Sequence, residues 1–212
     1  MIQYLKTKEE KIASENLKKS NLFVFDMGNV ITKPARIGEM YLRADMQCST
    51  EEFKRLFYHS PKADESYRGI INDDEFFDYI RMMTGSTKTS KNLQYLYRRC
   101  KGGIYAEAMQ EIQRLKEEGY QVYLLSNLRE IDYRCLSEKI TMSIFDKMFL
   151  SYKLGMSKPH EDIYKYVIDE LGTNNFYFFD DSKRNIEKAE SLGIQAYQTT
   201  GEEIPKWIKV LK

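Results

Sequence analysis

The sequence contains little cysteine, almost no net charge and no long apolar run. Its three cysteines, Cys48, Cys100 and Cys135, lie far apart without a C-x-x-C pair, which excludes a disulfide scaffold and a cysteine zinc site and is typical of a reducing cytoplasm. The 33 Lys and Arg residues nearly cancel the 32 Asp and Glu residues, so the basic excess of a nucleic-acid-binding protein is absent. No apolar stretch approaches the roughly 18 residues of a membrane-spanning helix, and residues 1–20 lack the apolar centre of a signal peptide.

The residues that are present can form one folded unit. Of 212 residues, 42% are hydrophobic and 31% charged, so the chain can bury a core and has the length of about one domain with a modest insertion. The lysines of residues 6–19 are interleaved with glutamates, which predicts a solvated helix face rather than a basic arm. We therefore expect a soluble, cytoplasmic protein that binds a small molecule, with no nucleic acid, membrane or obligate protein partner.

Three short apolar runs each end in polar residues that can carry chemistry. The runs and their endings are 22–25 before Asp26, 122–125 before Ser126 and Asn127, and 176–179 before Asp180 and Asp181. Near-continuous apolar runs without alternation indicate strands that are covered on both faces, as in a parallel sheet. Weaker strand patterns cover 147–151 and 194–198. Helical patterns at 104–115, 161–171 and 183–192 separate the runs, and this alternation predicts a doubly wound α/β sheet.

Residues 33–102 interrupt this alternation of strands and helices. They contain no convincing strand, but helical patterns cover 51–57, 73–83 and 90–99. About seventy residues between the first two core strands far exceeds an ordinary loop. We therefore predict a core domain made of residues 1–32 and 103–212, with a small helical subdomain, residues 33–102, inserted after the first strand.

The polar strand endings should meet in one crevice, because open α/β sheets bind ligands outside the carboxyl ends of their strands. The first and third endings bring carboxylates, the second brings hydrogen-bonding groups, and Lys158 follows the fourth strand. Clustered carboxylates repel one another unless a cation shares the site, and Mg²⁺ takes oxygen ligands beside phosphate groups. The pattern indicates Mg²⁺-assisted phosphoryl transfer, with an aspartate as a possible nucleophile.

These residues also resemble the four motifs of the haloacid dehalogenase-like hydrolases. The matching segments are Phe25-Asp26-Met27-Gly28-Asn29-Val30, Leu125-Ser126-Asn127, Lys158-Pro159, and Phe179-Asp180-Asp181-Ser182 with Asn185 following. Each motif alone is a weak signal, but four in order, each at a strand end, are a strong one. The resemblance spans residues 21–198 and implies a Rossmann-like core with a mobile helical cap of the type-one class between the first two motifs.

The resemblance implies the residues of the metal site. Asp26 would be the nucleophile and form an aspartyl-phosphate. Mg²⁺ would be held by Asp26, the Gly28 carbonyl and Asp181, and Asp180 would support the ion through water or through Lys158.

The resemblance likewise implies the residues that contact the substrate. Ser126 and Asn127 would bind the transferring phosphoryl oxygens, and Lys158 would offset charge on the nucleophile and the phosphoryl group. Asn29 and the insertion residue Arg68 are further candidates for substrate contact.

One position departs from the family pattern. Active phosphatases of the family usually carry an aspartate, the general acid and base, where this chain has Gly28, and losing such a group typically costs about 10²- to 10⁴-fold in rate. Three explanations compete: the leaving group needs little protonation, Asn29 or a cap residue supplies the proton, or the protein is slow or inactive. The D-x-G-N-V pattern also resembles that of bacterial α-glucose-1-phosphate phosphatases, which favours the first explanation.

Three functions therefore follow as hypotheses. The leading one is a Mg²⁺-dependent phosphatase for a small phosphorylated metabolite, with sugar phosphates favoured. The second is a metal-independent 2-haloacid dehalogenase, a class that also lacks the general-acid aspartate at the position of Gly28. The adjacent carboxylates of Asp180 and Asp181 would repel each other without a metal, which disfavours this function. The third is a catalytically idle protein that binds a phosphorylated ligand.

Overall fold

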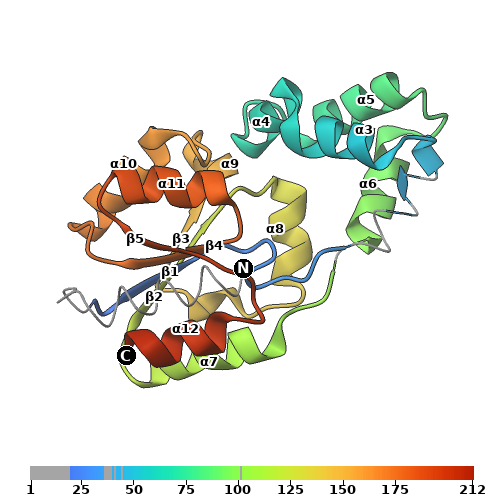
Figure 1. Ribbon diagram of the computed structural model, residues 1–212. Coiled ribbons are helices and arrows are strands. Elements are labelled where there is room, and N and C mark those ends of the chain that lie inside the picture. Colours follow the sequence, from blue (N-terminus) through green and yellow to red (C-terminus); the bar gives the residue numbers. More distant parts are fainter. Residues whose placement is uncertain (1–19, 36–39, 41, 44, 101) are drawn as a thin grey trace.

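The computed structural model describes residues 20–35, 40, 42–43, 45–100 and 102–212. The solvated helix predicted at 6–19 lies outside these residues. The described part contains five strands: β1 (Leu22–Phe25), β2 (Gln121–Ser126), β3 (Lys147–Leu150), β4 (Tyr177–Asp180) and β5 (Gln195–Gln198). All of them pair in parallel, in the order β3-β2-β1-β4-β5 (Figure 1). This arrangement confirms the predicted doubly wound α/β sheet.

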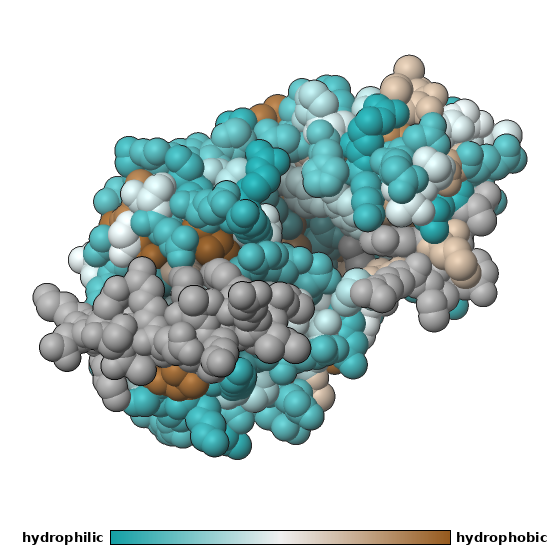
Figure 2. Space-filling model, viewed as in Figure 1, coloured by the Kyte–Doolittle hydropathy of each residue, from teal (hydrophilic) through white to brown (hydrophobic). Residues whose placement is uncertain are grey.

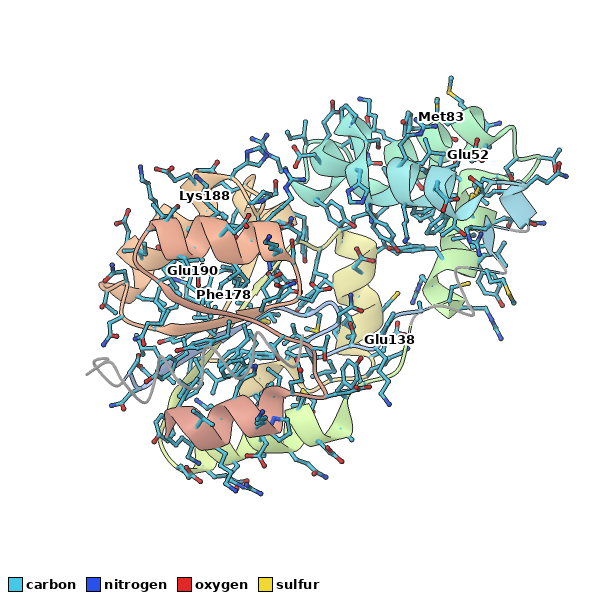
Figure 3. The ribbon with its side chains drawn as sticks, viewed as in Figure 1. Glu52, Met83, Glu138, Phe178, Lys188 and Glu190 are labelled. Carbon is cyan, nitrogen blue, oxygen red and sulfur yellow. The ribbon has the colours of Figure 1, made fainter. Side chains whose placement is uncertain are left out.

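Helices cover both faces of the sheet, so most strand residues are buried. The helices that follow the sheet strands or lead into them are α7 (Ala106–Glu117), α8 (Glu130–Ser137), α9 (Ser151–Leu154), α10 (Glu161–Leu171), α11 (Lys183–Ser191) and α12 (Ile204–Leu211), with a 3₁₀ turn at Met142–Ile144. Figure 1 shows α7 and α12 against one face and α10 and α11 against the other. Phe178 of β4 lies beneath α11 (Figure 3).

The central strand β1 shows how the apolar runs create this layering. Successive side chains of a strand point to opposite faces. Phe23 and Phe25 therefore pack in the cluster with α7 and α12, whereas Val24 packs in the cluster with α10 and α11. All three side chains are fully buried. A strand that is apolar on both faces can lie only in the middle of such a sandwich.

The helical insertion has a buried cluster of its own. Its elements are α3 (Thr50–Lys54), a π-helical turn η1 (Arg55–His59), α4 (Pro61–Tyr67), α5 (Asp73–Thr84) and α6 (Ser90–Arg99). Phe57, Phe76 and Phe77 are fully buried at its centre. Ile131 and Cys135 of α8 pack into the same cluster, while Leu136 of α8 packs into the sheet. Helix α8 thus belongs to both halves, and Figure 1 shows it between them.

The helix predicted at 51–57 is wrong in its extent. The α-helix stops at Lys54, and the chain continues as a π-helical turn to His59. Pro61 explains why the π-helical turn ends at His59 and a new helix begins. A proline cannot donate the next helical hydrogen bond, but it suits the first turn of a helix. Ser60 caps that new helix by accepting from the Ala63 N–H, and its hydroxyl donates to the Leu56 carbonyl.

Four helices in the described part of the chain were not predicted from the sequence, namely α4, α8, α9 and α12. Each has eight residues or fewer, which is at most about two turns. Two turns place too few apolar residues on one face to make a recognisable period. None of the helices in the described part of the chain has the length and hydropathy that crossing a membrane requires.

The two connections between the core and the insertion run side by side. The Lys33 N–H donates to the Gly103 carbonyl at 2.7 Å, and Thr32 pairs with Ile104. A side chain at Gly102 would collide with the Lys33 carbonyl, so this close approach requires glycine. The pairing supports our proposal that residues 33–102 form a separate cap between core segments 1–32 and 103–212.

Candidate active site

Three carboxylates gather where β1 and β4 end. Ligand oxygens of Asp26, Asp180 and Asp181 all lie within 4.8 Å of one another. The two strands are neighbours in the sheet, and the Asp26 N–H donates to the Phe179 carbonyl at 2.8 Å. This bond keeps the ends of β1 and β4 in register. Asp26 and Asp180 are buried, and Asp181 is half-buried.

Lys158 joins two of these carboxylates. Its ammonium group donates to Asp26 Oδ1 at 2.7 Å, to Asp180 Oδ2 at 2.5 Å and to the Leu125 carbonyl at 2.8 Å. The three donors of the ammonium group therefore each have an acceptor. Burial alone would lower the pKa of Lys158, but Asp180 and Asp26 raise it above its ordinary value. The lysine is charged at neutral pH and holds Asp26 in place.

One lysine does not balance three carboxylates. Burial raises the pKa of Asp180 and of Asp181, and the nearby Asp26 carboxylate raises both further. Asn29 Nδ2 donates to Asp181 Oδ2 at 2.6 Å, and Asn185 Nδ2 donates to both oxygens of Asp180 at 2.9 and 3.0 Å. These contacts orient the carboxylates but add no positive charge. A donor set of three carboxylates fits a hard divalent cation such as Mg²⁺.

The side-chain amide of Asn127 is bonded within the protein, and the contact of Asn127 with a phosphoryl oxygen stays a prediction. Its amide forms a reciprocal pair with the backbone of Lys158: Nδ2 donates to the Lys158 carbonyl at 2.8 Å, and Oδ1 accepts from the Lys158 N–H at 2.9 Å. Both ends of the amide are thus used to fix the lysine. Ser126 lies fully buried at the end of β2, directly before this pair.

Gly28 lies next to the Asp26 carboxylate. A methyl group placed there would meet only Asp26 Oδ2 within 4 Å, at an ordinary contact distance of 3.5 Å. The glycine is exposed. This position therefore has room for a side chain, and the missing acid of the family pattern is not excluded by crowding.

Two arginines, Arg68 and Arg129, lie where the insertion meets the core. Nε of Arg68 donates to the Gly155 carbonyl at 2.9 Å, so the contact of Arg68 with substrate stays a prediction. Arg129, which the sequence reading missed, is fully buried between α8 and the insertion. An arginine at a helix start carries no local signal of burial, so only the fold reveals it.

Comparison with known proteins agrees with this geometry. Residues 21–193 match the family model of the haloacid dehalogenase-like hydrolases. The chain belongs to this family. The match covers all four motifs and the insertion between them, so the predicted family is confirmed.

Two characterised relatives of the family are phosphatases. A sesquiterpene phosphatase of Aspergillus oryzae is 25% identical over 182 residues, which cover 84% of this chain and 88% of the relative. A D-ribitol-5-phosphate phosphatase of Bacteroides thetaiotaomicron is 25% identical over 185 residues, or 82% of this chain and 89% of the relative.

A solved structure of similar fold carries a metal and an anion. It is a haloacid dehalogenase family enzyme of Bacteroides thetaiotaomicron in complex with magnesium and inorganic phosphate, and it aligns with a TM-score of 0.71 at 26% identity. The alignment covers 85% of this chain and 94% of the other.

The pairing of Asn127 with Lys158 leads to a testable prediction. Replacing Asn127 by alanine leaves the N–H and carbonyl of Lys158 without these partners, which should destabilise the fold by about 1–3 kcal/mol. The displaced ammonium should also lower turnover by about tenfold to a hundredfold, because Asp26 loses its fixed position. Urea unfolding and steady-state assays measure the two effects. Asn92→Ala, on the exposed face of α6, is the control and should change neither.

Proposed function

We propose that this hydrolase is a Mg²⁺-dependent phosphatase for a small phosphorylated metabolite, with a sugar phosphate as the favoured class. The observation that carries the proposal is the group of three carboxylates, two of which, Asp26 and Asp180, are joined by Lys158. The phosphatase relatives and the neighbour with magnesium and phosphate support it.

The residues of the cluster suit the metal. Asp26, Asp181 and the Gly28 carbonyl would hold Mg²⁺, with Asp180 supporting them. When bound, the ion would offset negative charge on the phosphoryl oxygens. Burial, the largest cause, and the nearby Asp26 carboxylate raise the pKa values of Asp180 and Asp181, so a bound divalent cation would favour the charged forms of both groups.

The chemistry divides into two displacements at phosphorus. A carboxylate oxygen of Asp26 attacks, an aspartyl-phosphate forms, and the bond to the leaving oxygen breaks. Water then attacks the phosphorus, the bond to Asp26 breaks, and phosphate leaves with the carboxylate restored. Lys158, which donates to Asp26 Oδ1, would orient this carboxylate for attack and offset negative charge at the reacting centre, and Ser126 would bind a phosphoryl oxygen.

The missing acid at Gly28 limits which leaving groups depart easily. Without a positioned proton donor, the departing oxygen leaves with much of its negative charge. An anomeric hydroxyl is more acidic than an ordinary alcohol, so a sugar 1-phosphate suits this site better than a simple alkyl phosphate.

Asp26→Asn tests the nucleophile. The amide keeps the shape of the side chain but removes its charge, so phosphoryl transfer should fall by at least about 10³-fold while the protein stays folded. Phosphate release and circular dichroism measure activity and fold, with the exposed Asp169→Asn as the matched control. Activity within about tenfold of the parent would rule out a covalent role for this residue.

Mg²⁺ should stabilise the protein through the same cluster. At about a hundred times its dissociation constant, a ligand adds about 2.7 kcal/mol to the free energy of unfolding, and the melting temperature rises accordingly. Asp181→Asn should abolish most of this rise and Asp169→Asn none. The rise should shrink at pH 5, because burial raises the pKa of Asp181 and protons then compete with the cation. Turnover that EDTA leaves unchanged would contradict the metal requirement.

Gly28 predicts a steep dependence of the rate on leaving-group acidity. Single-turnover rates at saturating substrate should be much higher for aryl phosphates and sugar 1-phosphates than for alkyl phosphates of similar size. Gly28→Asp, for which the structure has room, should raise the rates of alkyl esters more than those of aryl esters. A flat dependence in the parent protein would show that another residue already delivers the proton.

A further inference from the structure

Arg129 reaches from the core into the helical insertion. It is the residue before α8 and follows Ser126 by three positions, so its backbone belongs to the loop that leaves β2. Its side chain is fully buried. Nε donates to Ser66 Oγ of α4 at 3.1 Å, one terminal nitrogen donates to the carbonyl of Phe57 in η1, and the other lies 3.5 Å from the Tyr97 hydroxyl of α6.

Two aromatic rings of the insertion stack on the same guanidinium. Its central carbon lies 4.0 Å from the ring centre of Tyr67 and 4.1 Å from that of Phe76. A planar, forked cation can stack and donate several hydrogen bonds at once, which lysine cannot do. The insertion therefore forms a socket whose shape and acceptors fit an arginine.

The charge of Arg129 is balanced from its own helix. Asp132 Oδ2 lies 3.8 Å from the guanidinium and accepts from the Arg129 N–H at 3.0 Å, while Oδ1 accepts from the Tyr97 hydroxyl at 2.8 Å. Burial alone would lower the pKa of Arg129, but Tyr67, Tyr97 and Asp132 raise it above its ordinary value. The cation is permanent, so it needs these partners whenever it is buried.

The backbone of Arg129 is tied to the carboxylate site. Ser151 Oγ accepts from the Leu128 N–H at 3.0 Å and donates to the Leu128 carbonyl at 3.2 Å, and Asn127 is paired with Lys158. Helix α4 also contacts the loop of Lys158, because Ser157 Oγ donates to Asp64 Oδ1 at 2.7 Å. The insertion thus touches both loops that line the site, and Figure 2 shows the surface hollowed between the two halves.

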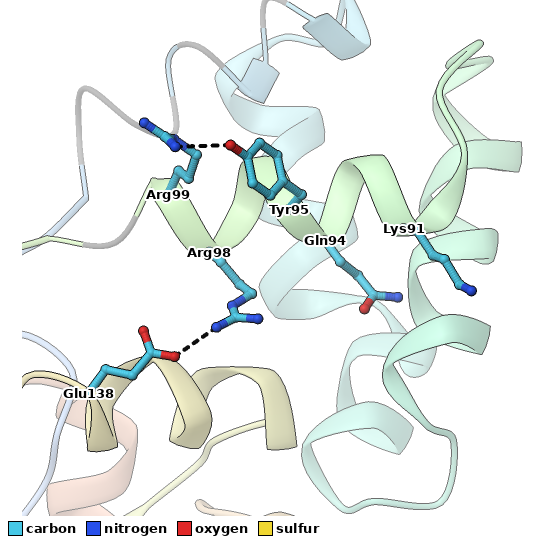
Figure 4. Close-up of a pocket in the computed structure, with 6 residues that line it drawn as sticks. All are labelled: Lys91, Gln94, Tyr95, Arg98, Arg99 and Glu138. Atoms are coloured by element: carbon cyan, nitrogen blue, oxygen red, sulfur yellow. Dashed lines mark hydrogen bonds and ion pairs between the residues drawn. The ribbon is translucent and has the colours of Figure 1, made fainter.

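Moving the insertion away from α8 would break the contacts of Arg129 together. The guanidinium would lose three acceptors and two rings, and such losses around a buried charge are costly. A second arginine makes a contact between the same two parts but in solvent: Arg98 of α6 donates to Glu138 at 2.8 Å (Figure 4). The side chains of that pair are 46% and 63% exposed, and exposed pairs contribute little.

We infer that Arg129 is a positioning residue that holds the helical insertion docked against the loops of Asn127 and Lys158, so that the insertion can grip the organic part of the substrate. The kinetic part of this inference rests on the proposed phosphatase function. If a substrate binds the open form and the docked form then grips it, weakening the docked form raises KM before it lowers kcat.

The test compares Arg129→Gln with Arg98→Gln as the matched control. With glucose 1-phosphate and Mg²⁺, Arg129→Gln should raise KM by about tenfold or more and change kcat by less than about threefold. The inhibition constant of inorganic phosphate, which has no organic part, should change by less than about threefold. Small-angle X-ray scattering with Mg²⁺ and phosphate should give Arg129→Gln a larger radius of gyration than the parent. Arg98→Gln should match the parent in all four measurements.

Other results would overturn the inference. Equal rises in KM and in the phosphate inhibition constant would mean that Arg129 shapes the phosphate loop itself. A lower melting temperature with unchanged KM and radius of gyration would mean that the arginine only stabilises the fold. If Arg129→Gln does not fold, Ser66→Ala and Tyr97→Phe each remove one partner of the guanidinium from the insertion. Both variants should raise KM by smaller factors than Arg129→Gln. An unchanged KM in both would count against the docking role. A parent protein without turnover would refute the proposed phosphatase, while scattering would still decide the docking role.

Discussion

The ammonium group of Lys158 is the interaction on which the site depends. It bonds to carboxylates at the ends of two neighbouring strands and to a carbonyl of a third strand. A buried cation is unfavourable unless its geometry is well satisfied, and here the backbone of the lysine is itself clamped by Asn127. The cost of misplacing this charge keeps the strand ends in register. Because one lysine balances only one of the three carboxylates, the same arrangement that orients Asp26 also favours the binding of a divalent cation.

The sheet makes this concentration of charge possible. Parallel strands that are apolar on both faces must be covered on both sides, which leaves only their ends for polar residues. In β1 the side chains of Phe23, Val24 and Phe25 fill the two cores alternately, and Asp26 is the first residue beyond them. Fold and site therefore share one cause: the apolar runs decide which edge is polar, and the polar edge carries the chemistry.

The sequence was sufficient for features that are local. Strand β1 and helix α10 lie at their predicted residues, because their apolar patterns and end signals are contained in a few neighbouring residues. The carboxylates and Lys158 were also predictable, since each follows a recognisable strand. The pairing of Asn127 with the Lys158 backbone joins residues 31 positions apart, and Arg129 reaches Phe57 across 72. Such contacts depend on how elements pack, which no local pattern encodes.

Arg129 and Gly28 together suggest how work is divided between the two halves of the protein. The core fixes the phosphoryl chemistry with rigid, buried charges, and the open position at Gly28 supplies no side chain to assist the leaving group. Recognition of the organic part of the substrate must therefore come from the insertion, and departure of the leaving group must depend on that group's own acidity. A buried arginine suits such a link, because its bonds to η1, α4 and α6 all act on one rigid group. It fixes where the insertion sits relative to the reacting carboxylate without adding a charge to the carboxylate cluster.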